Sequence, residues 1–327
     1  MTLTRLMKRR SPLWIRQAHH ERGPLVLSLS KDLFIRRFEY GLQYALALLL
    51  AVVVLGPFAW VLSASFQPES AIFKQPPDWL PQPVSLDNYV YVFTGQVPFK
   101  TDLSSGLTAG ITGDALFIPN SLGNTFIVAA SVLVVNLIVG TLTAYTFARE
   151  RFRGSRLAFN FVLGSRLLPP MAVAIPIYTL LRVLGLLDTR LGLVLVHAAF
   201  TLPLTIWVLT LYFRGLPREI EEAALVDGTG RFGALWHVVL PMSAPGLAAV
   251  GAFAFLFSYN EFLFAQLILD SIELKTVPVI LAAVSVNPDA TYTLIAVGVM
   301  LAILAPVVLA LVFRRYIVSG LVSSLER

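Results

Sequence analysis

EAALVDGTGRFGALWHVVLP, residues 222–241, lies between two long apolar runs and decides how the chain is organised. Just before it, Pro217 suits the first position of a helix. Three acidic side chains favour the positive end of that helix: Glu219, Glu221 and Glu222. Alanine and leucine continue the helix and Gly228 ends it, while a second short helix is predicted over residues 231–239, with Pro241 stopping it. The segment is therefore predicted to form a helix-turn-helix loop.

Three glycines of this stretch, Gly228-x-Gly230-x-x-Gly233, also match the spacing of a dinucleotide-binding fingerprint. That fingerprint needs a preceding strand and a βαβ unit, and neither is predicted here. The chain also has no G-x-x-x-x-G-K-[ST] phosphate loop. His197 and His237 are isolated and are interpreted as packing residues. We therefore expect no cofactor, no metal site and no catalytic residues.

The composition excludes a soluble globular domain. Of 327 residues, 57% are hydrophobic and 13% are charged, and the mean hydropathy is +0.76. The chain has no cysteine, so disulfides and thiolate metal sites are excluded. A net charge of +6 is compatible with nucleic-acid binding, but the basic residues lie next to apolar runs, where membrane topology explains them better.

Six apolar stretches are long enough to cross a hydrocarbon core of about 30 Å as helices. They lie near residues 42–65, 121–147, 157–184, 191–213, 246–269 and 292–313. Unbroken runs of this length do not alternate as the strands of a membrane barrel must. We therefore predict an all-α integral membrane protein with six transmembrane helices. Pro169, Pro170 and Pro176 are expected to kink or break the third helix.

The distribution of Lys and Arg predicts the orientation. With both termini inside, the four inner segments hold nine, four, three and three basic residues, nineteen in all, against five on the outer side. This asymmetry favours an N-in, C-in topology and puts the 222–241 loop in the cytoplasm. The predicted parts are a cytoplasmic arm over 1–40, a membrane domain over 41–318 that includes the loop at 214–245, and a short tail over 319–327.

Two segments outside the spans remain open to interpretation. The basic arm is too long to be a cleavable signal, and its residues 11–31 match no pattern that we recognise. The outer segment 67–119 is rich in Pro and Gly. It is interpreted equally well as a contact for a soluble solute-binding protein or as a structural cap over the helices.

Arg166 and Glu261 are the charged residues well inside predicted spans, where a charge is costly. We hypothesise that both residues face the bundle interior, where they either pair with each other or line a water-filled path. The alternative is that they link helices structurally and do not contact the substrate. Asn124, Asn136 and Asn160 are expected to form hydrogen bonds between helices.

The fixed points of the loop resemble the EAA loop of importer-type ABC permeases, E-A-A-x3-G-x9-I-x-L-P, with Val238 in place of Ile. The resemblance implies that a cytoplasmic ABC ATPase dimer binds this loop and that ATP hydrolysis resides in that partner. Because the side chains of two adjacent alanines are small, a groove on the partner protein could pack closely against the first helix. The implied coupling residues are Glu222, Ala223, Ala224, Asp227, Gly228, Leu240 and Pro241.

Two further stretches are similar to sugar permeases. Tyr259-Asn260-Glu261-Phe262 resembles their W-N-E-F-type sequence, and Arg166-Leu-Leu-Pro169-Pro170 resembles their third span. Over residues 40–322 the chain looks like the second permease subunit of maltose-type sugar importers. The resemblance implies the type I importer permease fold and a bacterial inner-membrane location. It also implies a homologous second permease, an extracytoplasmic solute-binding protein and a sugar or oligosaccharide substrate, with Arg166, Tyr259, Asn260 and Glu261 as candidates for the translocation path.

Three alternatives compete with this assignment. A permease of the same class for glycerol phosphate, a polyamine or an amino acid would share the loop. A secondary carrier acting alone would need no ATPase. An intramembrane enzyme is disfavoured because the chain shows no catalytic constellation.

Overall fold

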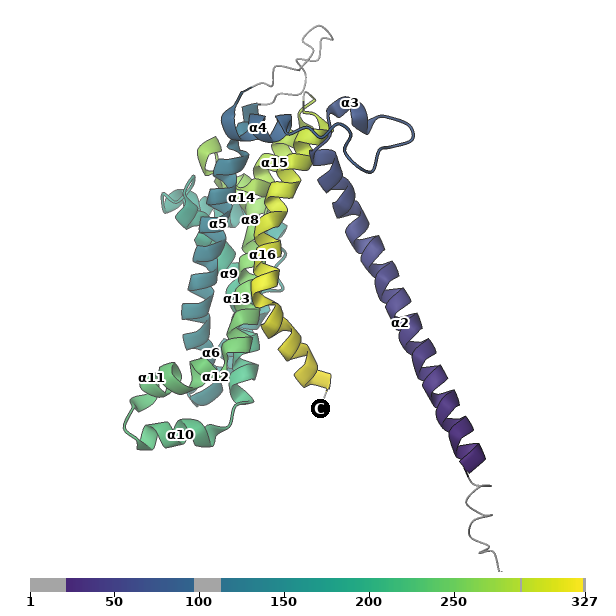
Figure 1. Cartoon of the computed structure of the whole chain (residues 1–327). Helices are drawn as coiled ribbons and strands as arrows, with labels where there is room; N and C mark the ends of the chain where they lie inside the picture. The colour runs from purple at the N-terminus through teal and green to yellow at the C-terminus, as the bar shows by residue number, and fades with distance from the viewer. Residues whose placement is uncertain (1–21, 97–112, 289, 326–327) are drawn as a thin grey trace, which may run out of the picture. The chain divides into compact units, whose positions relative to one another are not determined.

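The structure, a computed structural model, describes residues 22–96, 113–288 and 290–325. Every regular element in these ranges is a helix, which confirms the all-α prediction (Figure 1). The chain divides into two compact units, residues 1–60 and 61–327. Residues 1–21 of the predicted arm and the last two residues of the predicted tail lie outside the described residues.

In the first unit, residues 22–60 belong to helix α2 (Arg22–Ser65). Its part from Arg37 to Ser65 is long and apolar enough to span a membrane. The helix begins well before the predicted span at residue 42, so the second half of the predicted arm is helical. At the other terminus, α16 (Tyr292–Leu325) likewise runs through most of the predicted tail.

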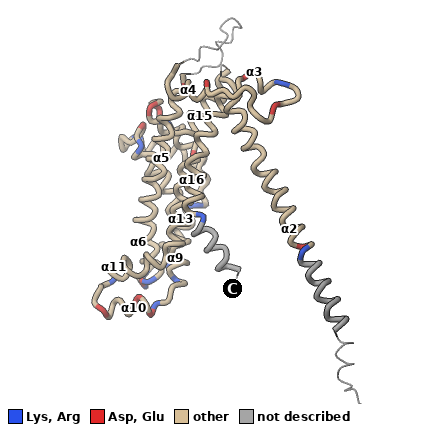
Figure 2. The backbone as a smooth tube through the Cα atoms, in the orientation of Figure 1, with Lys and Arg blue, Asp and Glu red and all other residues tan. Residues whose placement is uncertain are grey.

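The second unit contains three uninterrupted apolar runs long enough to span a membrane: Gly113–Arg149, α9 (Arg190–Arg214) and the Tyr292–Arg314 part of α16. The first run consists of η2 (Gly113–Phe117), α5 (Ile118–Val135), the π-helical turn η3 (Asn136–Gly140) and α6 (Thr141–Arg149). Helices α5 and α6 carry no charged side chain before Arg149, and Figure 2 draws them tan. Among the described residues the span candidates number four, or six if two bent helix pairs each count as one span.

The third predicted span is broken where its prolines are. Helix α7 (Ser155–Ser165) and helix α8 (Pro170–Val183) meet at an angle of 100°. Pro170 opens α8, a position where its missing N–H costs no helical hydrogen bond. The predicted break at Pro169 and Pro170 is confirmed, whereas Pro176 lies inside α8, which continues past it.

The fifth predicted span is not one helix. Helix α13 (Ala244–Tyr259) ends at Asn260, and a separate short helix, α14 (Leu263–Ile268), follows. With sixteen residues at 1.5 Å per residue, α13 is about 24 Å long, which is less than the hydrocarbon core of about 30 Å. The prediction of an uninterrupted helix over 246–269 was therefore wrong. The break is tolerated because polar side chains form hydrogen bonds with the backbone groups that it frees.

The core of the second unit lies where α5, α9, α13 and α14 meet. It includes Val128, Leu193, Ala254 and Phe264, all buried. Farther along, the run through η3 and α6 packs closely on α9 at Gly140, where an added Cβ would lie 2.6 Å from Thr205 Cγ2. The absence of a side chain at this position therefore sets how closely the two helices approach.

The end of the bundle opposite the 222–241 loop is covered by short elements: α3 (Glu69–Ile72), α4 (Asp87–Thr94), η5 (Ile272–Leu274) and α15 (Val277–Val286). Tyr91 of α4 is buried against Ile118 and Leu294. The Glu69 carboxylate accepts hydrogen bonds from the first N–H groups of α16, with Thr293 N at 3.0 Å. These contacts favour the cap interpretation of the 67–96 part of the outer segment; residues 97–112 lie outside the description.

Candidate functional site

The 222–241 stretch forms the predicted pair of helices at one end of the bundle, beside the end of α6 (Figure 1). Helix α10 (Arg218–Val226) follows Pro217, whose extended backbone precedes the helix and does not begin it. Gly228 then takes a φ of +83°, a left-handed conformation that glycine adopts without strain. The predicted turn at Gly228 is thus present.

The second helical run is longer than predicted. It consists of α11 (Gly230–Ala234), the π-helical turn η4 (Leu235–Val239) and α12 (Leu240–Met242). Pro241 was expected to stop the helix, but it lies at the start of the short turn α12, where a missing N–H is tolerated. The run turns by 81° into α13 only after Met242.

One buried carboxylate fastens α10 to the bundle. The Arg149 Nε donates to Glu221 Oε2 at 2.7 Å, and the Tyr145 hydroxyl donates to Glu221 Oε1 at 2.5 Å. Both partners come from α6, and both side chains of the ion pair are buried. At the rim, Arg231 pairs with Glu150, Nη1 to Oε1 at 2.5 Å. The first helix of the loop is therefore held by a side chain that the motif does not contain.

The sequence alone does not reveal this role of Glu221, which is one of three acids near the start of a predicted helix. In the structure Glu221 and Ala224, three residues apart, form the face of α10 that turns toward the bundle. Arg149 ends a long run without charged residues. Because Glu150 and Arg151 follow it directly, the sequence does not single out Arg149 as the partner of a buried carboxylate.

The predicted coupling residues lie mostly on the free side of the loop. Glu222, Ala223, Asp227, Gly228 and Pro241 are exposed, while Ala224 and Leu240 are half-buried. Large apolar side chains are exposed beside them: Val226 is 87% and Phe232 is 70% exposed, and Ile220 and Trp236 are also exposed. Several large exposed apolar side chains within one loop are typical of a protein interaction surface.

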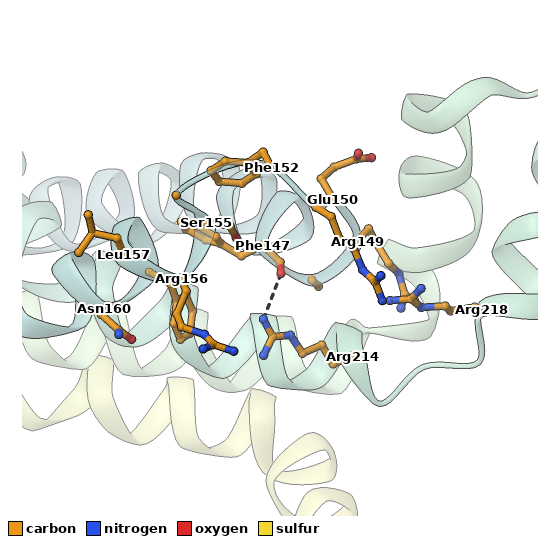
Figure 3. Close-up of a pocket in the computed structure, with 14 residues that line it drawn as sticks. Phe147, Arg149, Glu150, Phe152, Ser155, Arg156, Leu157, Asn160, Arg214 and Arg218 are labelled. Carbon is orange, nitrogen blue, oxygen red and sulfur yellow. Dashed lines mark hydrogen bonds between the residues drawn. The ribbon is translucent and has the colours of Figure 1, made fainter.

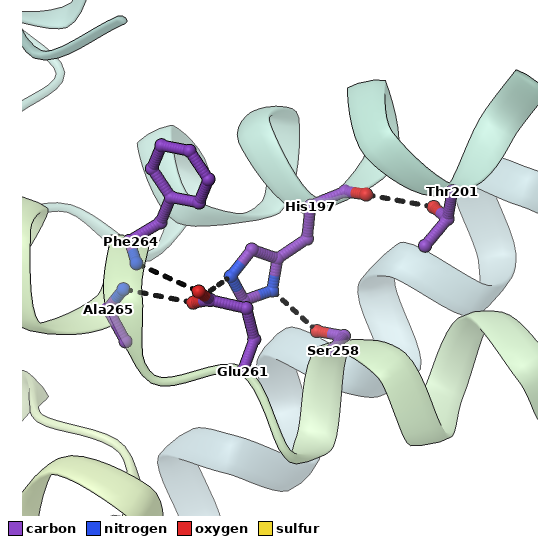
Figure 4. A network of polar contacts seen from close by, with 6 residues as sticks. All are labelled: His197, Thr201, Ser258, Glu261, Phe264 and Ala265. Carbon is purple, nitrogen blue, oxygen red and sulfur yellow. Dashed lines mark hydrogen bonds and ion pairs between the residues drawn. The ribbon is translucent and has the colours of Figure 1, made fainter. Parts of the chain in front are cut away.

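A second polar site lies inside the bundle at the break between α13 and α14 (Figure 4). His197 of α9 is fully buried, with Nε2 at 2.9 Å from Glu261 Oε2 and Nδ1 at 2.8 Å from Ser258 Oγ. Glu261 also accepts the backbone N–H groups of Phe264 and Ala265, at 2.9 Å and 3.1 Å. The carboxylate thus accepts hydrogen bonds from backbone N–H groups in the first turn of α14 and, through His197, links this turn to α9.

The four candidates for the translocation path do not form one cluster. Glu261 pairs with His197, whereas the guanidinium of Arg166 lies 5.6 Å from the centre of the Phe253 ring. Tyr259 is buried and donates to the carbonyl of Ala302 at 2.8 Å. The predicted isolation of His197 was wrong. Its partner is 64 residues away in the sequence, and no local pattern reveals it.

Two of the three predicted asparagine contacts are present. Asn136 donates to Thr201 Oγ1 and accepts from Thr205 Oγ1, both at 2.8 Å, across to α9. Asn124 accepts from Arg190 at 2.7 Å and donates to the backbone carbonyl of Glu273 at 2.7 Å. Asn160 is exposed and lines a surface groove. The first two asparagines therefore act as links between elements.

Asp188, in the connection between α8 and α9, holds the start of the 270–291 connection. Its Oδ1 accepts the backbone N–H groups of Asp270 and Ser271, both at 3.0 Å, and the Ser271 hydroxyl donates to its other oxygen. The Ser271 hydrogen bonds to the charged form keep the pKa of Asp188 below its usual value.

Comparison with known proteins points to one class. Residues 136–322 match the family described as the binding-protein-dependent transport system inner membrane component. The trehalose/maltose transport system permease protein MalG of Thermococcus litoralis is 31% identical over 84% of this chain and 92% of its own. The diacetylchitobiose uptake system permease protein NgcG of Streptomyces coelicolor is 36% identical over 70% of this chain and 68% of its own.

A solved structure shares the fold. It is that of a bacterial ABC transporter involved in the import of the acidic polysaccharide alginate. One of its chains aligns with a TM-score of 0.67 and 23% identity, covering 85% of this chain and 96% of that chain.

Proposed function

The chain belongs to the binding-protein-dependent transport system inner membrane component family, and we propose that it carries a sugar across the membrane under the control of an ATPase that grips the 222–241 loop. Membership makes it a multi-pass membrane permease subunit of an ABC importer. Such a subunit works with a partner permease, an ATPase and a binding protein. It has no catalytic activity of its own. The proposal concerns its cargo, its coupling residues and its orientation.

The exposed side of α10 and α11 supports the coupling role. Its apolar side chains are suited to a groove on a partner, while Glu221 ties the opposite side of α10 to α6. A force that the partner exerts on α10 would therefore be transmitted through the Glu221 attachment to α6. We assign the contact with the ATPase to Glu222, Ala223, Ala224, Asp227, Gly228, Leu240 and Pro241.

A carbohydrate cargo is supported by the relatives. Their names specify trehalose/maltose and diacetylchitobiose. The Tyr259-Asn260-Glu261-Phe262 stretch agrees with this class. Uptake of labelled sugars, glycerol phosphate, a polyamine and an amino acid by a strain lacking the gene identifies the cargo. Loss of sugar uptake is expected, and loss of only a non-sugar would refute the carbohydrate assignment.

Coupling is tested in proteoliposomes that contain the whole transporter. Gly228→Pro removes the left-handed turn and Glu222→Lys reverses a charge on the exposed face, so both should leave ATP hydrolysis intact but abolish most sugar uptake. Arg153→Gln, an exposed change in the neighbouring 150–154 turn, is the control and should transport normally. Normal coupling in both loop variants would contradict the proposal.

A further inference from the structure

A surface groove of about 900 Å³ lies beside the attachment of α10, between the end of α6, the start of α7 and the end of α9 (Figure 3). Its charged lining is five arginines and one glutamate: Arg149, Arg151, Arg156, Arg214, Arg218 and Glu150. Glu150 already pairs with Arg231, which is not part of the lining. Arg149 is paired with Glu221, so the positive charge without an ion pair among the described residues is that of the other four arginines of the groove.

The guanidinium groups are turned into this space. In Figure 3 the guanidinium of Arg156 points toward that of Arg214, and the side chain of Arg218 reaches toward that of Arg149. In the part of the chain that the structure describes, Arg151, Arg156 and Arg218 form no ion pair. Like charges facing one another are unfavourable unless an anion lies between them.

Arg149 supplies a second, independent observation. Its side chain is 7% exposed and its Nε is engaged by Glu221, but both Nη atoms are buried without a hydrogen-bond partner among the described residues. Buried guanidinium nitrogens without a partner are costly, and a phosphate oxygen is a strong acceptor for them. The charge and the unsatisfied donors thus favour a phosphate group.

The groove also continues onto an apolar surface. Phe147, Phe152 and Phe159 line it. Leu157 and Phe161, four residues apart on α7, lie on one helix face and are 77% and 78% exposed. An occupant that combines a phosphate with a long apolar chain matches this arrangement better than a free phosphate compound does, because the apolar face would otherwise be left uncovered.

We propose that the groove binds the headgroup phosphate of an anionic phospholipid, with an acyl chain lying along the Leu157 and Phe161 face of α7. Arg156 and Arg218 are the main contacts, and Arg214 is held in place by its hydrogen bond to the Phe147 carbonyl at 3.2 Å. Because Arg149 belongs both to the groove and to the Glu221 attachment, the lipid lies directly against the anchor of the 222–241 loop. The assignment does not depend on the cargo or on coupling.

Native mass spectrometry of the purified full-length chain, with whatever partner subunits co-purify, tests the site. Phosphatidylglycerol is titrated against phosphatidylcholine with the same acyl chains. The wild type should retain phosphatidylglycerol preferentially. Arg156→Gln and Arg218→Gln should each lower its apparent affinity about tenfold, the usual effect of losing a charge-assisted hydrogen bond. Neither arginine has an ion-pair partner among the residues that the structure describes, so folding should be unaffected.

Arg153→Gln is the matched control. Arg153 is exposed in the connection between α6 and α7, carries the same charge as the tested arginines and does not line the groove. It should bind phosphatidylglycerol as the wild type does. An equal loss in Arg153→Gln would show a general surface-charge effect and overturn the site, as would equal retention of the two lipids by the wild type. Displacement of the lipid by millimolar inorganic phosphate would assign the groove to soluble phosphate compounds and overturn the lipid.

Discussion

At the scale of single residues, Glu221 differs from its neighbour Glu222 in a way that only burial explains. The two glutamates are adjacent, but Glu221 is buried against Arg149 and Tyr145, while Glu222 is exposed. Exposed charges contribute little to stability, whereas removing one member of a buried ion pair leaves the other charge without a partner. The motif residue and the anchoring residue are therefore distinct.

We predict that Glu221→Gln destabilises the protein by about 3 kcal/mol, because the buried Arg149 loses its carboxylate. Glu222→Gln should change stability by less than about 0.5 kcal/mol, as is usual for an exposed site. Thermal unfolding of the two purified variants in detergent measures the difference. Equal unfolding temperatures would show that the ion pair does not hold α10.

Asp188 gives a pH-dependent prediction at the same scale. Its pKa is lowered in the folded state by the Ser271 hydrogen bonds, so the stability that it contributes is present above its unfolded pKa and is lost as pH falls through the lower folded value. Asn tolerates the φ of +55° found at residue 188. The unfolding temperature of Asp188→Asn should therefore be below that of the wild type at neutral pH, and the gap should close below about pH 4. A gap independent of pH would contradict this origin.

At the scale of elements, the approach of α6 to α9 depends on a residue without a side chain. Gly140→Ala would put a methyl group 2.6 Å from Thr205 Cγ2, and the helices would have to move apart. We expect a loss of about 1 to 3 kcal/mol, typical of overpacking. Gly123→Ala on α5 is the control, since its new methyl group meets nothing within 4 Å, and it should be neutral or stabilising by up to about 1 kcal/mol. Similar unfolding temperatures for both variants would refute the close-packing argument.

The elements also show which features a sequence predicts and which it does not. The break at Pro169 and Pro170 was predictable because proline carries its backbone restriction wherever it occurs. The break at Glu261 was not predictable, because hydropathy averages over a window and Glu261 is satisfied by His197 from another helix. Glu221 and Arg149 are likewise 72 residues apart. Local chemistry is readable in one sequence, but pairing between distant residues needs the fold.

At the scale of the whole second unit, a continuous series of contacts joins the loop to the break in the fifth span. Glu221 contacts Arg149 and Tyr145 at the end of α6, and the same helical run reaches Asn136, which bonds to Thr201 and Thr205 of α9. Helix α9 in turn carries His197 to Glu261. The loop and the intramembrane polar site are thus connected through two rigid helices, α6 and α9.

The orientation of the chain gives the last prediction. Nineteen basic residues on one side against five on the other favour cytoplasmic termini and a cytoplasmic 222–241 loop. The chain has no cysteine, so single cysteines report their own location. Asp227→Cys replaces an exposed residue of the loop, and Asp78→Cys replaces a residue at the other end of the bundle whose side chain is 42% exposed. In intact cells a membrane-impermeant maleimide should label Asp78→Cys only, whereas inverted membrane vesicles should give labelling of Asp227→Cys only. The reverse pattern would place the loop where no cytoplasmic ATPase reaches it, and the coupling role would then be refuted together with the topology.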